Sequence, residues 1–237
     1  MKLNEIYGGN KKPISFEVFP PKTDGGNTDE LISSLKKLEK FNPSLISVTY
    51  GAGGTSRERS AELVKRIKKE LGTIPMPHFT CVCSTKSFIE KYIKDIESEG
   101  IENILALRGD SPDDMAESSG DFRHADELVR FIREKTNLSI GVAGYPEGHK
   151  DSKNPESDMD FLKRKIDAGA SAVFTQLFFD NRFFFDFMER AEKAGVSVPV
   201  IPGILPIKSI AQLKKMTDMC GASIPEKIFH EFSIHSR

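Results

Sequence analysis

The sequence predicts an α/β protein built as a (β/α)8 TIM barrel, with about seven of the eight strand–helix units evident. Short β-branched or apolar runs alternate with charged stretches about every 30 residues, which is typical of parallel strands joined by helices. The charged stretches carry apolar residues at i, i+3 and i+4, the helical spacing. No G-x-G-x-x-G motif follows the first run, which disfavours an open dinucleotide-binding sheet and favours the barrel.

Each apolar run is expected to be one strand. In chain order the expected strands are residues 14–19, 45–50, 76–82, 103–109, 139–145, 172–179 and 198–205. Several of the stretches between them begin with Thr, Ser or Asp and end near Gly, as capped helices do. The expected helices are residues 28–41, 56–72, 85–100, 124–137, 158–170 and 181–195, with a further helix in 208–219. No eighth strand is evident after that helix. We therefore expect one barrel domain over residues 1–237 that is open, C-terminally short or completed by a partner.

The composition excludes several classes of protein. The 34 Lys and Arg residues nearly balance 35 Asp and Glu residues, so no electrostatic field favours nucleic acid or an anionic membrane. The N-terminus lacks the apolar segment of a secretory signal, and no run reaches the ~18 apolar residues of a membrane span. Three cysteines make no disulfide framework, and five histidines show no metal-ligand spacing. A cytoplasmic protein without a metal site is expected.

Polar residues recur on one face of the predicted strands. Residues two apart share a face, and catalytic groups of barrels collect at the C-terminal strand ends. The residues expected to face the lumen are Glu17, Ser47, Thr49, His78, Thr80, Arg108, Asp110, Tyr145 and Gln176. Phe16, Val18, Cys81 and Cys83 fall on the opposite face and are expected to pack against helices. Several strands thus contribute to one concave polar site.

Each of these residues also has an ordinary structural interpretation. Glu17 could be a solvated strand end, His78 a core histidine and Gln176 a partner of a neighbouring strand. The basic run 163–165 could be a solvated helix face. No lysine lies inside a predicted strand, which disfavours a Schiff-base enzyme. A carboxylate on the first strand and an Arg/Asp pair on the fourth suit general acid chemistry beside a bound organic cofactor.

Eight motifs in register resemble those of the methylenetetrahydrofolate reductase family. They are FEVFPPK (16–22), SVTYGAGG (47–54), PHFTC (77–81), ALRGD (106–110), VAGYPEGH (142–149), LKRKIDAGA (162–170), TQLFFD (175–180) and IPGILP (201–206). The resemblance spans about residues 14–226 and implies a flavoprotein of one-carbon and methionine metabolism. Such an enzyme reduces 5,10-methylenetetrahydrofolate to 5-methyltetrahydrofolate with noncovalent FAD, and NADH or NADPH donates hydride in a ping-pong reaction.

The resemblance also implies roles for individual residues. Glu17 matches the general acid that protonates the folate, and Asp110 matches a catalytic carboxylate near flavin and pterin. Positions matching FAD contacts are Thr49, Tyr50, His78, Arg108, Gly109, Asp110, Tyr145, His149, Asp158, Arg164 and Lys165. Positions matching substrate contacts are Glu17, Thr49, Asp110, Gln176 and Gln212.

The chain departs from the family pattern in three ways. His124 stands where the family usually has Tyr, and Met216 stands where some bacterial members have a Phe that stacks on the nicotinamide cofactor. The last strand–helix unit is not evident. These departures leave the electron donor open, and they leave a homo-oligomer or a partner subunit as the expected assembly. They also keep two alternatives: a truncated, non-catalytic flavin- or folate-binding member or subunit, and an unrelated TIM-barrel lyase.

Overall fold

The protein forms a curled parallel sheet with helices around it. A computed structural model describes residues 1–21, 27–50, 57–109, 120–150, 152 and 154–235. Within these residues the sheet has seven strands in the order β1-β2-β3-β4-β5-β6-β7, and every pairing is parallel. The strands are β1 (Ser15–Val18), β2 (Leu45–Val48), β3 (Pro75–Thr80), β4 (Asn103–Leu107), β5 (Ser139–Gly144), β6 (Ala172–Thr175) and β7 (Val200–Ile201). Seven strand–helix units of a TIM-like fold are thus confirmed.

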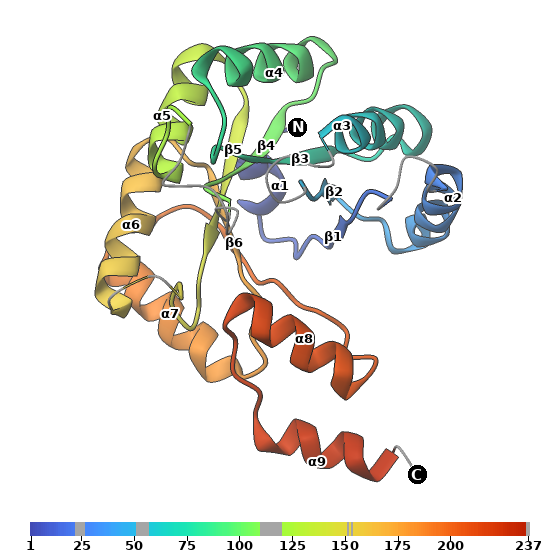
Figure 1. The fold of residues 1–237 in the computed structure, drawn as a ribbon, viewed down its shortest axis with the longest axis vertical. Coiled ribbons are helices and arrows are strands. Elements are labelled where there is room, and N and C mark those ends of the chain that lie inside the picture. Colours follow the sequence, from blue (N-terminus) through green and yellow to red (C-terminus); the bar gives the residue numbers. More distant parts are fainter. Residues whose placement is uncertain (22–26, 51–56, 110–119, 151, 153, 236–237) are drawn as a thin grey trace.

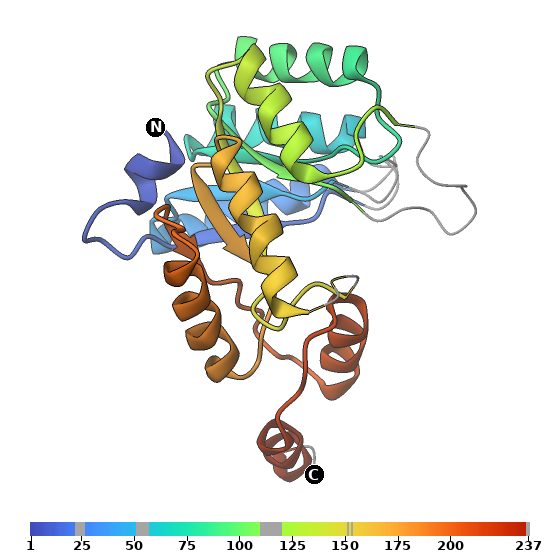
Figure 2. The ribbon, with the colours of Figure 1, turned by 90° about the vertical axis from the view of Figure 1, so that its left-hand side faces the viewer.

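Helices alternate with the strands, and α2 to α7 cover the outer face of the sheet, whereas α9 projects away from it (Figures 1 and 2). They are α1 (Leu3–Tyr7), α2 (Thr28–Leu38), α3 (Arg57–Arg66), α4 (Lys86–Ser98), α5 (Ala125–Lys135), α6 (Pro155–Asp167), α7 (Asn181–Lys193), α8 (Ile210–Cys220) and α9 (Glu226–His235). Short α1 and terminal α9 were not expected from the sequence. No helix in the described ranges has the length and apolar character to cross a membrane.

The predicted alternation of faces is confirmed by two separate apolar cores. The helix-side core includes Ile46, Val48, Phe79 and Cys81, with Phe16 and Val18 packed against it. The lumen core consists of Leu3, Ile6, Leu45, Met76, Leu105 and Ala172. Helix α1 therefore fills the N-terminal end of the lumen with apolar side chains. Polar residues are left for the C-terminal end, where the strands of a parallel barrel carry their functional groups.

The strands end earlier than their apolar runs. β4 stops at Leu107, β5 at Gly144 and β6 at Thr175, so the polar residue that follows each strand lies just beyond the sheet. β7 keeps only two residues because Pro199 and Pro202 flank it and cannot donate backbone hydrogen bonds to a ladder. Arg108, Tyr145 and Gln176 thus lie on the short segments that leave the sheet, whereas Glu17 and His78 lie within β1 and β3.

Candidate functional site

Two adjoining cavities lie at the C-terminal ends of the strands. The first has a volume of about 450 Å³ and lies between the ends of β4 and β5 and the helices α5 and α6. The second, of about 310 Å³, lies over the ends of β1, β3, β4, β5 and β6. Both cavities are lined by Leu107, Arg108, Ala143, Tyr145 and His149. Volumes of this size are typical of small-molecule and cofactor sites.

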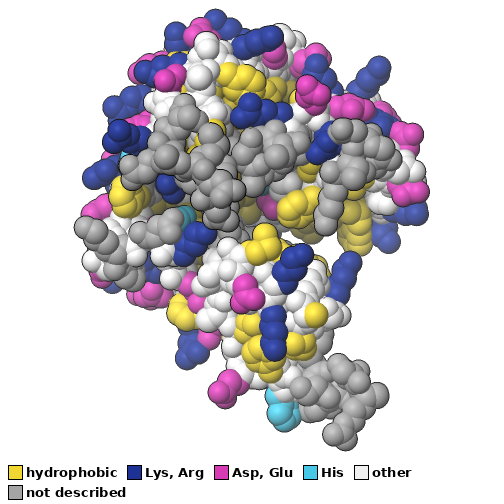
Figure 3. Space-filling view, viewed as in Figure 1, with side chains coloured by type: hydrophobic (Ala, Val, Ile, Leu, Met, Phe, Trp, Pro, Cys, Tyr) yellow, Lys and Arg dark blue, Asp and Glu magenta, His cyan; other side chains and the backbone are white. Residues whose placement is uncertain are grey.

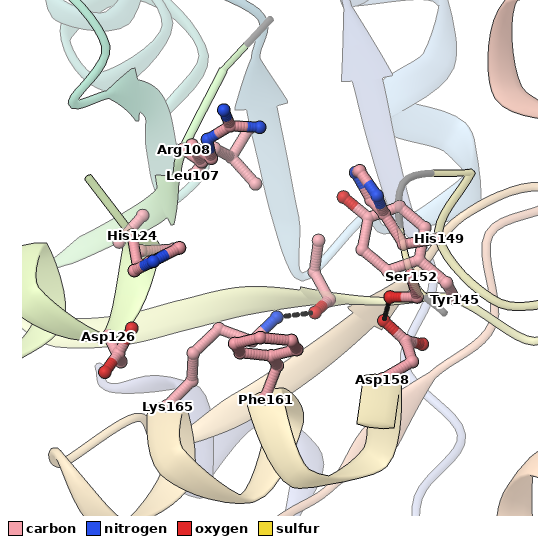
Figure 4. A pocket seen from close by; sticks show the side chains of 13 residues that line it. Leu107, Arg108, His124, Asp126, Tyr145, His149, Ser152, Asp158, Phe161 and Lys165 are labelled. Carbon is pink, nitrogen blue, oxygen red and sulfur yellow. Dashed lines mark hydrogen bonds between the residues drawn. The ribbon is translucent and has the colours of Figure 1, made fainter. Parts of the chain in front are cut away.

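A buried lysine supplies positive charge to the first cavity. Lys165 Nζ donates a hydrogen bond to the carbonyl of Ala143 at 2.6 Å. Burial lowers the pKa of Lys165 to about 8, and the nearby carboxylate of Asp158 opposes this shift. Burial raises the pKa of Asp158, whose Oδ1 accepts a hydrogen bond from the Ser152 hydroxyl at 3.2 Å. Figure 4 shows both groups directed into the same cavity. A desolvated ammonium of this kind gains from an anionic ligand.

The geometry of α6 explains this arrangement. Asp158, Phe161 and Lys165 follow one another at spacings of three and four residues, so one face of the helix presents all three to the cavity. The ring of Phe161 lies 5.9 Å from the His124 ring between centroids, with a tilt of 31°. Two rings thus border the first cavity, and they form a surface suited to a flat heterocycle.

A carboxyl group and a histidine meet in the second cavity. Glu17 Oε2 lies 3.5 Å from His78 Nε2. His78 is buried, and burial lowers its pKa to about 4, so the imidazole is neutral at pH 7. The Glu17 side chain is 54% exposed because it faces the cavity, yet the surrounding protein desolvates it and raises its pKa. The pair therefore holds a carboxyl group that stays protonated to a higher pH than an ordinary glutamate.

The bend after β4 requires glycine. Gly109 has φ +85°, and a Cβ at this position would lie 2.8 Å from Cβ of Thr80 and 2.9 Å from Cγ1 of Val82. Only glycine combines this left-handed backbone with so close an approach to β3. The bend sets Arg108 on the wall that the two cavities share.

Other predicted residues also line the cavities. Gln176 lines the second cavity, and its side-chain oxygen accepts a hydrogen bond from the backbone of Leu177 at 2.8 Å. Tyr145 and His149 meet edge to face, with 4.6 Å between ring centroids. Unlike these residues, Arg164 does not line either cavity, and its guanidinium lies 5.2 Å from the centroid of the Phe161 ring.

Some predicted contacts do not line either cavity. Tyr50 is buried in the helix-side core, where its ring lies 5.3 Å from that of Phe79. The carbonyl of Thr49 accepts a hydrogen bond from Ser60, and the side chain of Gln212 accepts one from the backbone of Lys208. Their roles remain predictions, as does that of Asp110, which lies outside the described residues.

Several residues that line the cavities were not predicted as site residues. The clearest are Asp126, Phe161, Met219 and Cys220, together with His124, which the sequence marked only as a departure from the family. The spacing of Phe161 from Asp158 and Lys165 could have identified it. Met219 and Cys220 carry no such signal, because the path of α8 brings them to the cavity.

Comparison with known proteins identifies the family of this chain. The methylenetetrahydrofolate reductase family matches residues 2–236. The chain is 39% identical to the 5,10-methylenetetrahydrofolate reductase of Salmonella typhimurium over 223 residues, which cover 94% of this chain and 73% of that protein. It is 36% identical to methylenetetrahydrofolate reductase (NADH) 1 of Zea mays, with 96% of this chain and 40% of the maize protein covered.

A solved structure shares the fold at low sequence identity. An uncharacterized protein from Clostridium thermocellum, described as binding two copies of 5-methyl-5,6,7,8-tetrahydrofolic acid, superposes with a TM-score of 0.64 at 16% identity. The superposition covers 94% of this chain and 76% of that one. At this identity the similarity concerns the fold alone. The family match and the Salmonella relative, by contrast, are similarities of sequence that extend along nearly the whole chain. The chain belongs to the methylenetetrahydrofolate reductase family.

Proposed function

We propose that the protein reduces 5,10-methylenetetrahydrofolate to 5-methyltetrahydrofolate, with noncovalent FAD as the hydride carrier and NADH or NADPH as the donor. The observation that carries this proposal is the connection between the two cavities. The first cavity holds a buried ammonium, Lys165, and the second holds a carboxyl group with a raised pKa, Glu17. Arg108 lies on the wall that the two cavities share. A long ligand with an anionic middle and a reactive ring fits this arrangement.

The residues of the first cavity fit the nucleotide part of FAD. Lys165 would neutralise phosphate charge, and Asp158 would accept hydrogen bonds from ribose hydroxyls. The rings of Phe161 and His124 would pack on adenine. Tyr145, His149 and Arg108 then line the passage toward the second cavity. When bound, the flavin supplies hydride transfer between the nicotinamide and the folate.

Glu17 is the group that would move a proton. Opening the methylene bridge of the folate requires protonation of a weakly basic amine nitrogen, and a carboxyl group with a raised pKa can provide that proton near neutral pH. His78 supports this role because it is neutral. A charged imidazolium 3.5 Å away would stabilise the carboxylate and make Glu17 a poorer acid.

The second cavity is small enough that two substrates would occupy it in turn. Its volume of about 310 Å³ is bounded by Glu17, Gln176 and the residues shared with the first cavity. The nicotinamide would leave before the folate enters, which gives ping-pong kinetics. The maize relative's name specifies NADH. We propose NADH or NADPH here, because the described residues that line the cavities show no feature specific to a 2′-phosphate.

The function is tested by flavin content and by the two half-reactions of Glu17→Gln. Purified protein should show flavin absorbance, or acquire it on incubation with FAD. Glu17→Gln should keep flavin reduction by the nicotinamide within about twofold but lower folate reduction by roughly 10²–10⁴-fold, the usual contribution of a general acid. Stopped-flow absorbance of the flavin measures both steps.

The outcomes separate the alternatives. Protein that binds no flavin would refute the cofactor and favour a family member without flavin chemistry. Flavin-loaded protein without folate reduction would favour a non-catalytic binding member. Equal loss of both half-reactions in Glu17→Gln would contradict the proton-donor role. Glu156→Gln, on the exposed first turn of α6, is the matched control and should leave both half-reactions unchanged.

A further inference from the structure

The last turn of α8 forms part of the wall of the Glu17 cavity. Met219 and Cys220 end this helix and line the cavity together with Glu17, His78 and Gln176. Met219 is 65% exposed, so its side chain is accessible to a ligand in this cavity. The opposite end of α8, at Gln212, faces no described cavity. The helix therefore approaches the site by its C-terminal turn.

Figure 3 shows the surface hollowed between α8 and the end of the sheet near β1, with apolar side chains on both sides. Cys220 also lines a narrower recess that Tyr145, Gly148 and Gln176 share. Cys220 therefore shares this recess with Tyr145 and Gln176, which also line the larger cavity. Because Cys220 borders both spaces, it is placed to contact whatever occupies the larger one.

A carboxylate clamp holds this turn in place. Both oxygens of Glu147 accept a hydrogen bond from the backbone N–H of Ser223, at 3.1 and 3.0 Å. Ser223 follows Gly221, whose left-handed backbone at φ +74° ends α8. Glu147 lies in the loop after β5, and Arg190 donates a hydrogen bond to the carbonyl of Pro146 in the same loop at 3.1 Å. The clamp therefore joins the loop that carries Tyr145 to the turn that carries Cys220.

We propose that Met219 and Cys220 contact the substrate ring system and that Glu147 is the positioning residue that holds them there. This proposal rests on the proposed function, because the ligand it names is a folate. Thioether and thiol groups are polarizable and pack on flat rings. Glu17 and Gln176 supply the polar contacts of the same cavity, so α8 provides an apolar surface for the ring while the strands provide hydrogen bonds.

Alkylation of the thiol tests the contact in the unmodified, flavin-loaded protein. Iodoacetamide labelling followed by peptide mass spectrometry gives a rate for each cysteine. At a 5-methyltetrahydrofolate concentration about ten times its Kd, labelling of Cys220 should slow about tenfold, because only the free fraction reacts. Cys83 is half-buried and lines no described cavity, so its labelling rate is the internal reference and should not change.

The two ways of failing are distinguishable by calorimetry on the same sample. If 5-methyltetrahydrofolate binds and Cys220 reacts at its original rate, the contact is wrong and the proposed function stands. If no binding is detected by titration at any concentration, the proposed function fails first. Equal slowing at Cys83 and Cys220 would indicate a general tightening of the fold and would also overturn the contact.

Variants of Glu147 test the clamp. Glu147→Ala should raise KM for methylenetetrahydrofolate about tenfold with kcat changed less than twofold. Glu147→Gln keeps one acceptor oxygen, so its KM should lie close to that of the wild type. Asp218→Ala removes an exposed carboxylate of α8 and is the control. Thermal unfolding shows whether each variant is folded. An unchanged KM in folded Glu147→Ala, or an equal loss in Glu147→Ala and Glu147→Gln, would overturn the positioning role.

Discussion

At the scale of single residues, burial decides the protonation of the candidate site. Desolvation favours the neutral form of three groups in the site. It raises the pKa of Glu17 and lowers the pKa values of His78 and Lys165. The imidazole of His78 is therefore neutral at pH 7, and the carboxyl group of Glu17 holds its proton to a higher pH than an ordinary glutamate. Lys165 has a pKa of about 8, so it stays mostly charged at pH 7, and an anionic ligand would raise its pKa further.

His78 should make stability depend on pH. Its pKa is about 4 in the folded protein and about 6.5 in the unfolded chain, so the unfolded state binds more protons between these values. Stability is therefore lost as pH falls through that window, by roughly 2 to 3 kcal/mol at pH 4.5. Urea unfolding at pH 7.5 and 4.5 should show this loss in the wild type and a smaller one in His78→Gln.

The comparison uses the pH effect within each variant, so any change in stability that His78→Gln causes at pH 7.5 cancels. His230→Gln alters an exposed histidine on α9 and should behave as the wild type. An identical pH effect in His78→Gln and the wild type would show that His78 is not the buried neutral group described here.

At the scale of the elements, α6 places the polar groups of the first cavity. Asn154 caps its N-terminus, where Oδ1 accepts a hydrogen bond from the backbone of Ser157 at 2.8 Å. Asp158 follows within the first turn and Lys165 two turns later on the same face. The position of both charged groups therefore depends on where this helix begins.

Removing the cap should cost stability. Asn154→Ala leaves a backbone N–H of the first turn without its partner, and we expect a loss of about 1 kcal/mol in the free energy of unfolding. Asn154→Asp retains the acceptor and should stay within a few tenths of a kcal/mol of the wild type. Urea denaturation followed by circular dichroism measures both. A loss in Asn154→Asp as large as in Asn154→Ala would indicate a cause other than capping.

At the scale of the whole molecule, one sheet connects all of the described strand–helix units. β1 and β7 each pair with one neighbouring strand in the described part of the chain. Exposed apolar side chains accompany these outer strands, namely Ile14 and Phe19 beside β1 and Ile204 after β7. The helix-side core nevertheless runs from α2 to α7, which is why we propose a single domain over residues 1–237.

A single domain predicts one cooperative unfolding transition. The chain has no Trp and four Tyr, so tyrosine fluorescence and far-UV circular dichroism of the flavin-free protein report on different features of the fold. The two transitions should coincide in urea. Phe79 is fully buried in the helix-side core. Phe79→Ala should therefore lower the free energy of unfolding measured by either signal by the same amount, roughly 3–5 kcal/mol. Two separated transitions would divide the chain into independent units.

Much of the architecture could be predicted because its signals are local. Period-two alternation assigned Phe16, Val18 and Cys81 to the helix side, and the structure agrees. The boundaries were less accurate, since the runs through Arg108, Tyr145 and Gln176 leave the sheet before those residues. An apolar run records burial, and burial continues beyond the last ladder hydrogen bond.

The sequence by itself determined the parallel strand–helix order, the two faces of each strand and the family, since periodicity and motifs are properties of neighbouring residues. Only the tertiary structure decided that Glu17 lies next to His78. It also decided that His124 and Phe161 line the first cavity and that Met219 and Cys220 line the second. These contacts join residues far apart in the chain. Glu147 and Ser223 are 76 positions apart, and the packing of α8 brings them into contact.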